Sequence, residues 1–136
     1  MHQSTTFSTV LYRAGVALVA LLLLAAVVPS GASAKEVEVK MTDSPAAFVP
    51  AKVTIKVGDK VEWVNSAQSL HSVDADPANA QDKGDVVLPP GAKPFDSGFM
   101  APGAKYSYTF TVPGTYKYVC LPHEKDGMKG EIVVEK

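Results

Sequence analysis

Several features that define common functional classes are scarce or absent in this chain. Its 136 residues include one cysteine and three histidines, and the formal net charge is −1. A single cysteine excludes an internal disulfide, and the absence of a basic patch or stripe argues against nucleic-acid binding. No segment after the first 34 residues has convincing helical periodicity. We therefore expect one small domain built mainly from β-strands.

The first 34 residues are expected to be a cleaved secretory signal peptide. Arg13 precedes an apolar run from Ala14 to Val28, and small residues follow up to Ala34. Charged, apolar and small-residue regions in that order, ending in an A-x-A sequence, are typical of export signals. The run is shorter than the roughly 20 apolar residues that span a bilayer. We therefore expect cleavage after Ala34 rather than an uncleaved anchor, and a mature chain, Lys35 to Lys136, that is periplasmic or otherwise extracytoplasmic.

Alternating apolar residues predict short β-strands in the mature chain. Strand patterns occupy 36–41, 52–57, 60–64, 105–112, 115–120 and 131–136, whereas the proline-containing stretch 43–50 reads as a turn-rich passage. A Gly58-Asp59 turn separates two of these strands, and by strand parity Trp63 and Cys120 face the core. Strands of this length separated by turns indicate an all-β, two-sheet β-sandwich.

One long segment, 74–94, fits this pattern poorly, because it is polar and rich in proline, glycine and alanine. Loops of this length in compact domains are often functional or mobile. A solvated loop without a specific role is an equally good account, and a short strand around 86–88 fits within it. Our hypothesis that the segment steers a basic partner rests on its four aspartates, Asp74, Asp76, Asp82 and Asp85.

The most informative stretch reads YKYVCLPHEKDGMKG and holds Cys120, His123 and Met128 in the spacing C-x2-H-x4-M. A thiolate, an imidazole and a thioether this close together form a soft donor set, which favours copper. A trigonal copper site needs a second imidazole. His2 would leave with the signal peptide, so His71 is the remaining histidine. The mature chain thus supplies one complete set of candidate metal ligands: His71, Cys120, His123 and Met128.

The order of these residues resembles that of the cupredoxins, the small blue-copper proteins, and is most similar to the plastocyanins among them. The likeness covers nearly all of 37–135, a plastocyanin-like copper-binding domain within 35–136. It is most specific in the loop from Cys120 to Met128, the following Gly130, the Val57-to-Asp59 turn and the approach from Asn65 to His71. The resemblance implies a Greek-key sandwich with one type 1 copper ion, held by His71, Cys120 and His123 with Met128 as the weak axial ligand.

In this family the second histidine of the ligand loop reaches the surface through an apolar patch and serves as the electron port. His123 would be that port, with Leu121 and Pro122 beside it and Leu70 and Ala67 on the facing loop.

Three features depart from the plastocyanin pattern. Val119 stands where photosynthetic plastocyanins carry a tyrosine, and Ser72 where an asparagine often joins the two ligand loops by hydrogen bonds. The segment 74–94 has no clear counterpart. These departures bear on the partner more than on the metal.

The ligand set predicts an exported blue-copper electron carrier, not an enzyme, because four protein ligands leave no open position for a substrate. We expect a redox protein donor and acceptor that dock near His123, no nucleic acid, no stable membrane insertion after signal cleavage, and a monomer. The main alternative is a periplasmic copper-binding and delivery protein, which would favour exposed ligands over a core-facing thiolate. A Cys120–His123 nucleophile pair, a structural zinc site and an adhesive domain each leave part of the ligand set unexplained.

Overall fold

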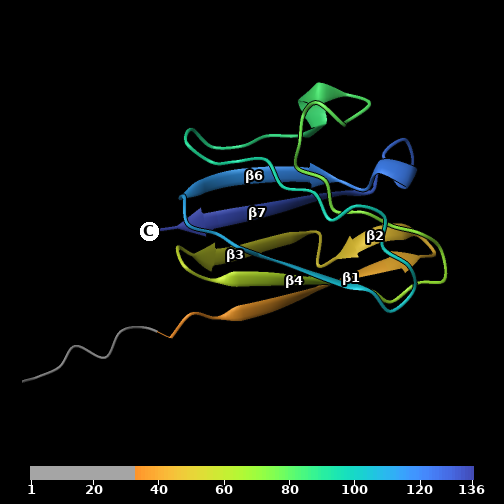
Figure 1. Cartoon of the computed structure of the whole chain (residues 1–136), viewed down its shortest axis with the longest axis horizontal. Coiled ribbons are helices and arrows are strands. Elements are labelled where there is room, and N and C mark those ends of the chain that lie inside the picture. The colour runs from red at the N-terminus through yellow and green to blue at the C-terminus, as the bar shows by residue number, and fades with distance from the viewer. Residues whose placement is uncertain (1–32) are drawn as a thin grey trace, which may run out of the picture. The chain divides into compact units, whose positions relative to one another are not determined.

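The computed structural model describes residues 33–136, so residues 1–32 of the expected signal peptide lie outside the described part. Two sheets pack face to face (Figure 1). Among residues 33–136 no helix is both long and apolar enough to cross a membrane. One sheet has the order β2-β1-β4-β5 and the other β3-β7-β6. Their bounds are β1 Glu36–Asp43, β2 Ala46–Val49, β3 Lys52–Lys56, β4 Lys60–Asn65, β5 Lys105–Thr109, β6 Gly114–Val119 and β7 Lys129–Glu135.

The predicted all-β, two-sheet sandwich is confirmed, and the sheets are mixed. β1 pairs with β4 in parallel and β3 with β7 in parallel, whereas the remaining pairs are antiparallel. The two strands expected around Gly58-Asp59 are present but do not pair with each other, since β3 and β4 belong to different sheets. The turn therefore carries the chain from one sheet to the other.

The passage 43–50, expected to be turn-rich, contains a strand that sequence analysis missed. β2 pairs antiparallel with β1 and buries Phe48. Pro45 and Pro50 flank this strand of four residues, so its alternation is too short to stand out.

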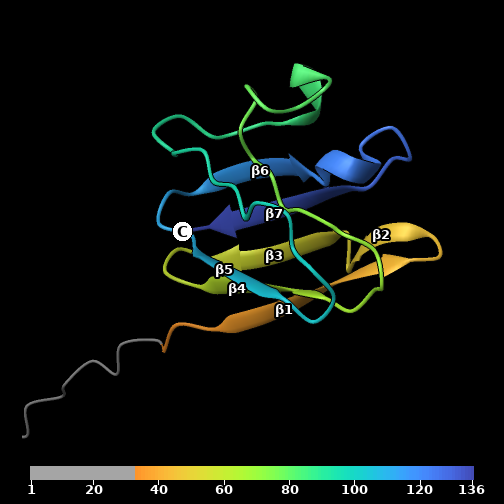
Figure 2. The same ribbon diagram turned by 45° about the vertical axis from the view of Figure 1, so that its right-hand side comes forward.

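The long segment 74–94 runs beside β6 (Figure 2). It contains a short 3-10 turn, η1 (Lys83–Asp85), and the strand expected at 86–88 is reduced to a single bridge between Val87 and Lys117. A second bridge joins Asp74 to Val119. Because these bridges lie on β6, the segment covers part of an edge that would otherwise expose unpaired backbone groups.

The core between the sheets is rich in aromatic side chains. Trp63 on β4 and Tyr118 on β6 are both fully buried, and the Trp63 Nε1–H donates to the Tyr118 Oη at 3.0 Å. Tyr116 and Cys120 are buried on the same inner face, as the strand parity predicted. The end of β6 therefore aims the thiol inward, at the edge of a rigid core.

Candidate metal centre

Three of the predicted ligands meet at one end of the sandwich. Cys120 directly follows β6, and His123 ends the 3-10 turn η2 (Leu121–His123), visible at the right of Figure 1. The Cys120 Sγ lies 3.5 Å from the His71 Nδ1 and 3.6 Å from the His123 Nδ1. One ligand atom from each of the three residues lies within 4.8 Å of the others. His71 and Cys120 are fully buried and His123 is half-buried.

The ligand loop from Cys120 to Met128 closes back on itself. The His123 N–H donates to the Cys120 carbonyl at 3.0 Å, and the Met128 N–H donates to the His123 carbonyl at 3.1 Å. The Cys120 N–H in turn donates to the Met128 carbonyl at 3.1 Å, and the Met128 side chain is buried. These bonds hold the chain segments that carry the three residues in one fixed arrangement.

Ser72 joins the two ligand loops, although the sequence suggested that it would do so less fully than asparagine. Its N–H donates to the Cys120 Sγ at 3.3 Å, and its Oγ accepts from the Leu121 N–H at 2.9 Å. Burial raises the pKa of the Cys120 thiol, while hydrogen bonds from Ser72 and His123 oppose that shift. A buried thiol with a raised pKa is poorly suited to act as a nucleophile, whereas a bound metal cation would deprotonate it.

A buried asparagine builds the loop that presents His71. The Asn65 Nδ2 donates to the Ser69 and Met100 carbonyls at 2.9 and 2.8 Å, and its Oδ1 accepts from the Ala67 N–H at 3.0 Å. Backbone hydrogen bonds between His71 and Met100 run in both directions. The Asn65 amide therefore pairs with three backbone groups, and the Met100 carbonyl accepts from both Asn65 and the His71 N–H.

Asp43 touches the far side of the His71 ring, a contact that sequence analysis missed. Its Oδ1 lies 3.0 Å from the His71 Nε2, across a separation of 28 residues in the chain. Its Oδ2 accepts from the backbone N–H groups of Gln68 at 2.9 Å and Ser69 at 3.2 Å. The hydrogen bond from the Gln68 N–H lowers the pKa of Asp43 the most, and the contact with His71 lowers it further.

Glu124, also unanticipated, connects the segment 74–94 to the ligand loop. Its side chain is nearly buried and accepts from the N–H of Gln81 at 2.8 Å and of Asp82 at 2.9 Å. Because Glu124 directly follows His123, the segment is held against the loop that carries two of the candidate ligands.

The four aspartates of that segment do not form one exposed acidic surface. Asp74 is fully buried and accepts from the Asp76 N–H and the Asn79 Nδ2, and burial raises its pKa. Asp85 pairs with Lys129 at 2.6 Å. Asp74 is fully buried and cannot contact a partner directly, whereas the steering of a basic partner by the four aspartates stays a prediction.

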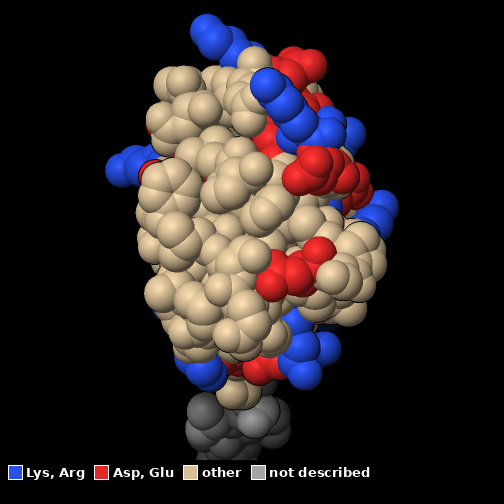
Figure 3. Space-filling model, turned by 90° about the vertical axis from the view of Figure 1, so that its right-hand side faces the viewer, with Lys and Arg blue, Asp and Glu red and all other residues tan. Residues whose placement is uncertain are grey.

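The ligand end of the molecule carries a broad uncharged surface (Figure 3). Leu70 and Phe99, neighbours of the bridged pair His71 and Met100, are 53% and 68% exposed, the two highest values among the large apolar side chains of the described residues. Pro122 is exposed and Leu121 half-buried. Ala67, expected with Leu70 on the loop that faces His123, is buried. Sequence analysis missed Phe99.

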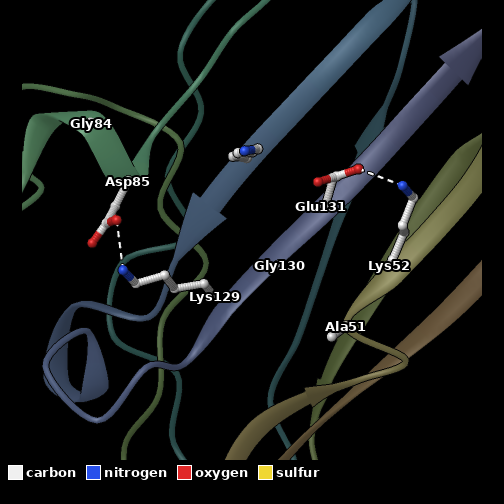
Figure 4. Close-up of a pocket in the computed structure, with 8 residues that line it drawn as sticks. Ala51, Lys52, Gly84, Asp85, Lys129, Gly130 and Glu131 are labelled. Atoms are coloured by element: carbon white, nitrogen blue, oxygen red, sulfur yellow. Dashed lines mark hydrogen bonds and ion pairs between the residues drawn. The ribbon is translucent and has the colours of Figure 1, made fainter.

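A crevice of about 370 Å³ lies on the sheet formed by β3, β7 and β6 (Figure 4). Four of its charged side chains form two ion pairs. Lys52 contacts Glu131 at 2.8 Å, and Lys129 contacts Asp85. None of the candidate metal ligands lines the crevice, so it is not part of the candidate metal site.

The sequence model of one protein family, described as copper binding proteins, plastocyanin/azurin family, matches residues 35–135. A plastocyanin from Nostoc punctiforme is 37% identical over 137 residues, covering 94% of this chain and 96% of that protein. Among solved structures, a pseudoazurin from Methylobacterium extorquens AM1 superimposes with a TM-score of 0.61 at 25% identity, over 75% of this chain and 76% of that chain. A reduced Cu(I) form of an amicyanin variant superimposes with a TM-score of 0.57 at 32% identity, over 74% of this chain and 82% of that chain.

Proposed function

Because this chain belongs to the plastocyanin/azurin family of copper-binding proteins, with copper as its cofactor, we propose that it is an exported blue-copper electron carrier. It shuttles single electrons between a redox donor and a redox acceptor and is not an enzyme. The observation that carries this proposal is the convergence of the Cys120 Sγ with the Nδ1 atoms of His71 and His123 at a largely buried site.

We propose that His71, Cys120, His123 and Met128 would hold the copper ion, with Met128 as the weakest of the four ligands. Two imidazoles, a thiolate and a thioether fit a type 1 copper site, whereas zinc sites use cysteine, histidine and carboxylate ligands. Bound copper supplies one-electron chemistry by alternating between Cu(I) and Cu(II). The hydrogen bonds that close the loop, together with those of Ser72, limit how far the ligands move when the charge changes. Small rearrangement favours rapid electron exchange.

His123 is the proposed electron port. It is half-buried, contacts the buried Cys120 sulfur through Nδ1 and is adjacent in the chain to the exposed Pro122. The broad uncharged surface at this end of the molecule excludes water when a partner docks there, at a lower cost than desolvating charges. A redox protein that presents an uncharged face would therefore bind here transiently and bring its own centre close to His123.

Export and the monomeric state are part of the proposal. The family match begins at residue 35, directly after the proposed cleavage site at Ala34. The Lys35 N–H donates to the Asp59 Oδ1 at 2.7 Å, so the folded domain uses the first residue of the proposed mature chain. We propose that the mature protein is a monomer in the periplasm or another extracytoplasmic compartment and is not stably inserted in a membrane after signal cleavage.

The decisive experiment is the visible absorption spectrum of residues 35–136 loaded with Cu(II). We expect an intense thiolate-to-copper band that bleaches on reduction, returns on oxidation and is abolished by Cys120→Ser. Met128→Leu should shift the band or the reduction potential. The matched control is Met41→Leu, which makes the same substitution at another fully buried methionine and should change neither.

A colourless Cu(II)-treated protein whose thiol still reacts freely would refute the copper-thiolate site and the electron-carrier proposal with it. Copper that passes readily to an acceptor, from a site with no accessible redox couple, would instead indicate copper delivery.

A further inference from the structure

The carboxylate of Asp43, at the end of β1, is the meeting point of three N–H groups. Its Oδ1 lies 3.0 Å from the His71 Nε2, and its Oδ2 accepts from the backbone N–H groups of Gln68 and Ser69 at 2.9 and 3.2 Å. The Asp43 side chain is 31% exposed, whereas that of His71 is 0% exposed. A carboxylate at the surface thus reaches one edge of a completely buried imidazole.

This contact determines which nitrogen of His71 carries the proton. An ionised carboxylate can only accept hydrogen bonds, so the His71 Nε2 must be the donor. A neutral imidazole protonated at Nε2 has its lone pair on Nδ1, and that atom lies 3.5 Å from the Cys120 Sγ. Asp43 therefore favours the one neutral form of His71 that can bind a metal next to the sulfur.

We propose that Asp43 is the positioning residue of the buried ligand, fixing the His71 tautomer and lowering the reduction potential of the copper site. This inference rests on the proposed function, because it takes His71 as a copper ligand. A carboxylate that accepts the Nε2–H makes the imidazole a stronger electron donor. Since the oxidised site carries one more positive charge than the reduced site, a stronger donor and a nearby negative charge both favour Cu(II).

Asparagine cannot reproduce this arrangement, although it has nearly the same shape as aspartate. Its amide has one oxygen and one NH2 group, whereas three N–H donors converge on Asp43. If the oxygen faces Gln68 and Ser69, the NH2 faces the His71 Nε2 and favours the tautomer protonated at Nδ1. If the oxygen faces His71, the NH2 opposes two backbone N–H groups. Asp43→Asn should therefore perturb the imidazole with little change in volume.

The test compares Asp43→Asn with Asp126→Asn in the purified processed protein. Asp126 is an exposed carboxylate on the ligand loop, so its replacement removes the same charge without touching the His71 ring. Three quantities are measured: the His71 tautomer in the metal-free protein by 1H–15N NMR, the midpoint reduction potential, and the Cu(II) affinity by chelator competition.

For the unaltered protein we expect a single His71 tautomer with a slowly exchanging Nε2 proton. Asp43→Asn should populate the Nδ1-protonated form, raise the potential and weaken Cu(II) binding by roughly 10- to 100-fold. Asp126→Asn should leave the tautomer unchanged and shift the potential less.

An Asp43→Asn protein that keeps the Nε2-protonated tautomer, with a potential shifted no more than in Asp126→Asn, would overturn the inference. Lower metal-free stability accompanied by an unchanged tautomer and potential would also overturn it, because Asp43 would then only hold the loop. If Asp43→Asn does not fold, Asp43→Ala is measured in the same way, since truncation at this partly exposed position leaves the core intact. Failure of the proposed function is distinct, because the unaltered protein would then lack the blue band.

Discussion

Replacing Gly130 by alanine is expected to destabilise this protein strongly, because β7 passes directly under a buried aromatic ring at this residue. Gly130 pairs with Tyr118 across β6 and β7. A Cβ atom at Gly130 would overlap the Cζ and Oη atoms of Tyr118 and would lie 2.6 Å from its Cε1. Tyr118 is fully buried and its Oη accepts the Trp63 Nε1–H, so the ring has no free space into which to move.

The expected cost follows from two effects. Forcing one extra carbon into a well-packed core costs about 1–3 kcal/mol. If the Tyr118 ring moves far enough to break its bond to Trp63, the unsatisfied buried donor costs about another 1–3 kcal/mol. Gly130→Ala should therefore lower the free energy of unfolding by about 1–3 kcal/mol if that bond survives and by about 2–6 kcal/mol if it breaks, compared with the 5–15 kcal/mol typical of small domains.

Urea unfolding of the metal-free protein measures this loss without a contribution from copper binding. The matched control is Gly84→Ala in the exposed turn η1, where the nearest atom to a new Cβ is the Asp82 Oδ1 at 3.2 Å. In a Tyr118→Ala background, Gly130→Ala should cost much less, because the ring is gone. A loss below about 1 kcal/mol in the unaltered background, or an equal loss in both backgrounds, would refute the argument.

Three further predictions concern hydrogen bonds around the site and at the opposite end. Ser72→Ala should cost about 1–3 kcal/mol in urea unfolding, because the Leu121 N–H loses its acceptor; the blue band should survive, and its loss would contradict this role. Glu124→Gln should speed amide hydrogen exchange at Gln81 and Asp82, and unchanged exchange would mean that Glu124 does not hold the segment. Hydrogen bonds from the Lys56 and Lys35 N–H groups hold the pKa of Asp59 below its usual 3.8. Since a lowered folded-state pKa stabilises the protein above the unfolded-state value, the destabilisation by Asp59→Asn should be full at pH 6 and shrink as the pH falls below about 4. A pH-independent difference between the two proteins would contradict this.

The fold could be predicted well where apolar and polar residues alternate along a strand. It was predicted poorly where strands are short or irregular. Inward-facing residues such as Trp63 and Cys120 followed from period-two parity, which the pleat of a strand imposes locally. β2 was missed because four residues between two prolines carry too little alternation. The separation of β3 and β4 into different sheets could not be read from their turn, because strand pairing depends on contacts between distant segments.

By itself, the sequence predicted the set of candidate ligands and the class of metal. The spacing C-x2-H-x4-M and the scarcity of histidine are properties of composition and local order, and soft ligands select copper whatever the fold. The family resemblance, stated on the same residues, is confirmed by the comparisons.

Only the tertiary structure decided which groups surround those donors. Asp43 lies 28 residues from His71 in the chain, and nothing local marks it as the partner of that ring. Asp74 reads like any solvated aspartate and Ala67 like any loop residue, yet packing buries both. Burial and long-range hydrogen bonds arise from how the sheets and loops pack, so they carry no periodic signal in the sequence. These long-range contacts place the Asp43 carboxylate against the His71 ring and join the two loops that carry His71 and Cys120.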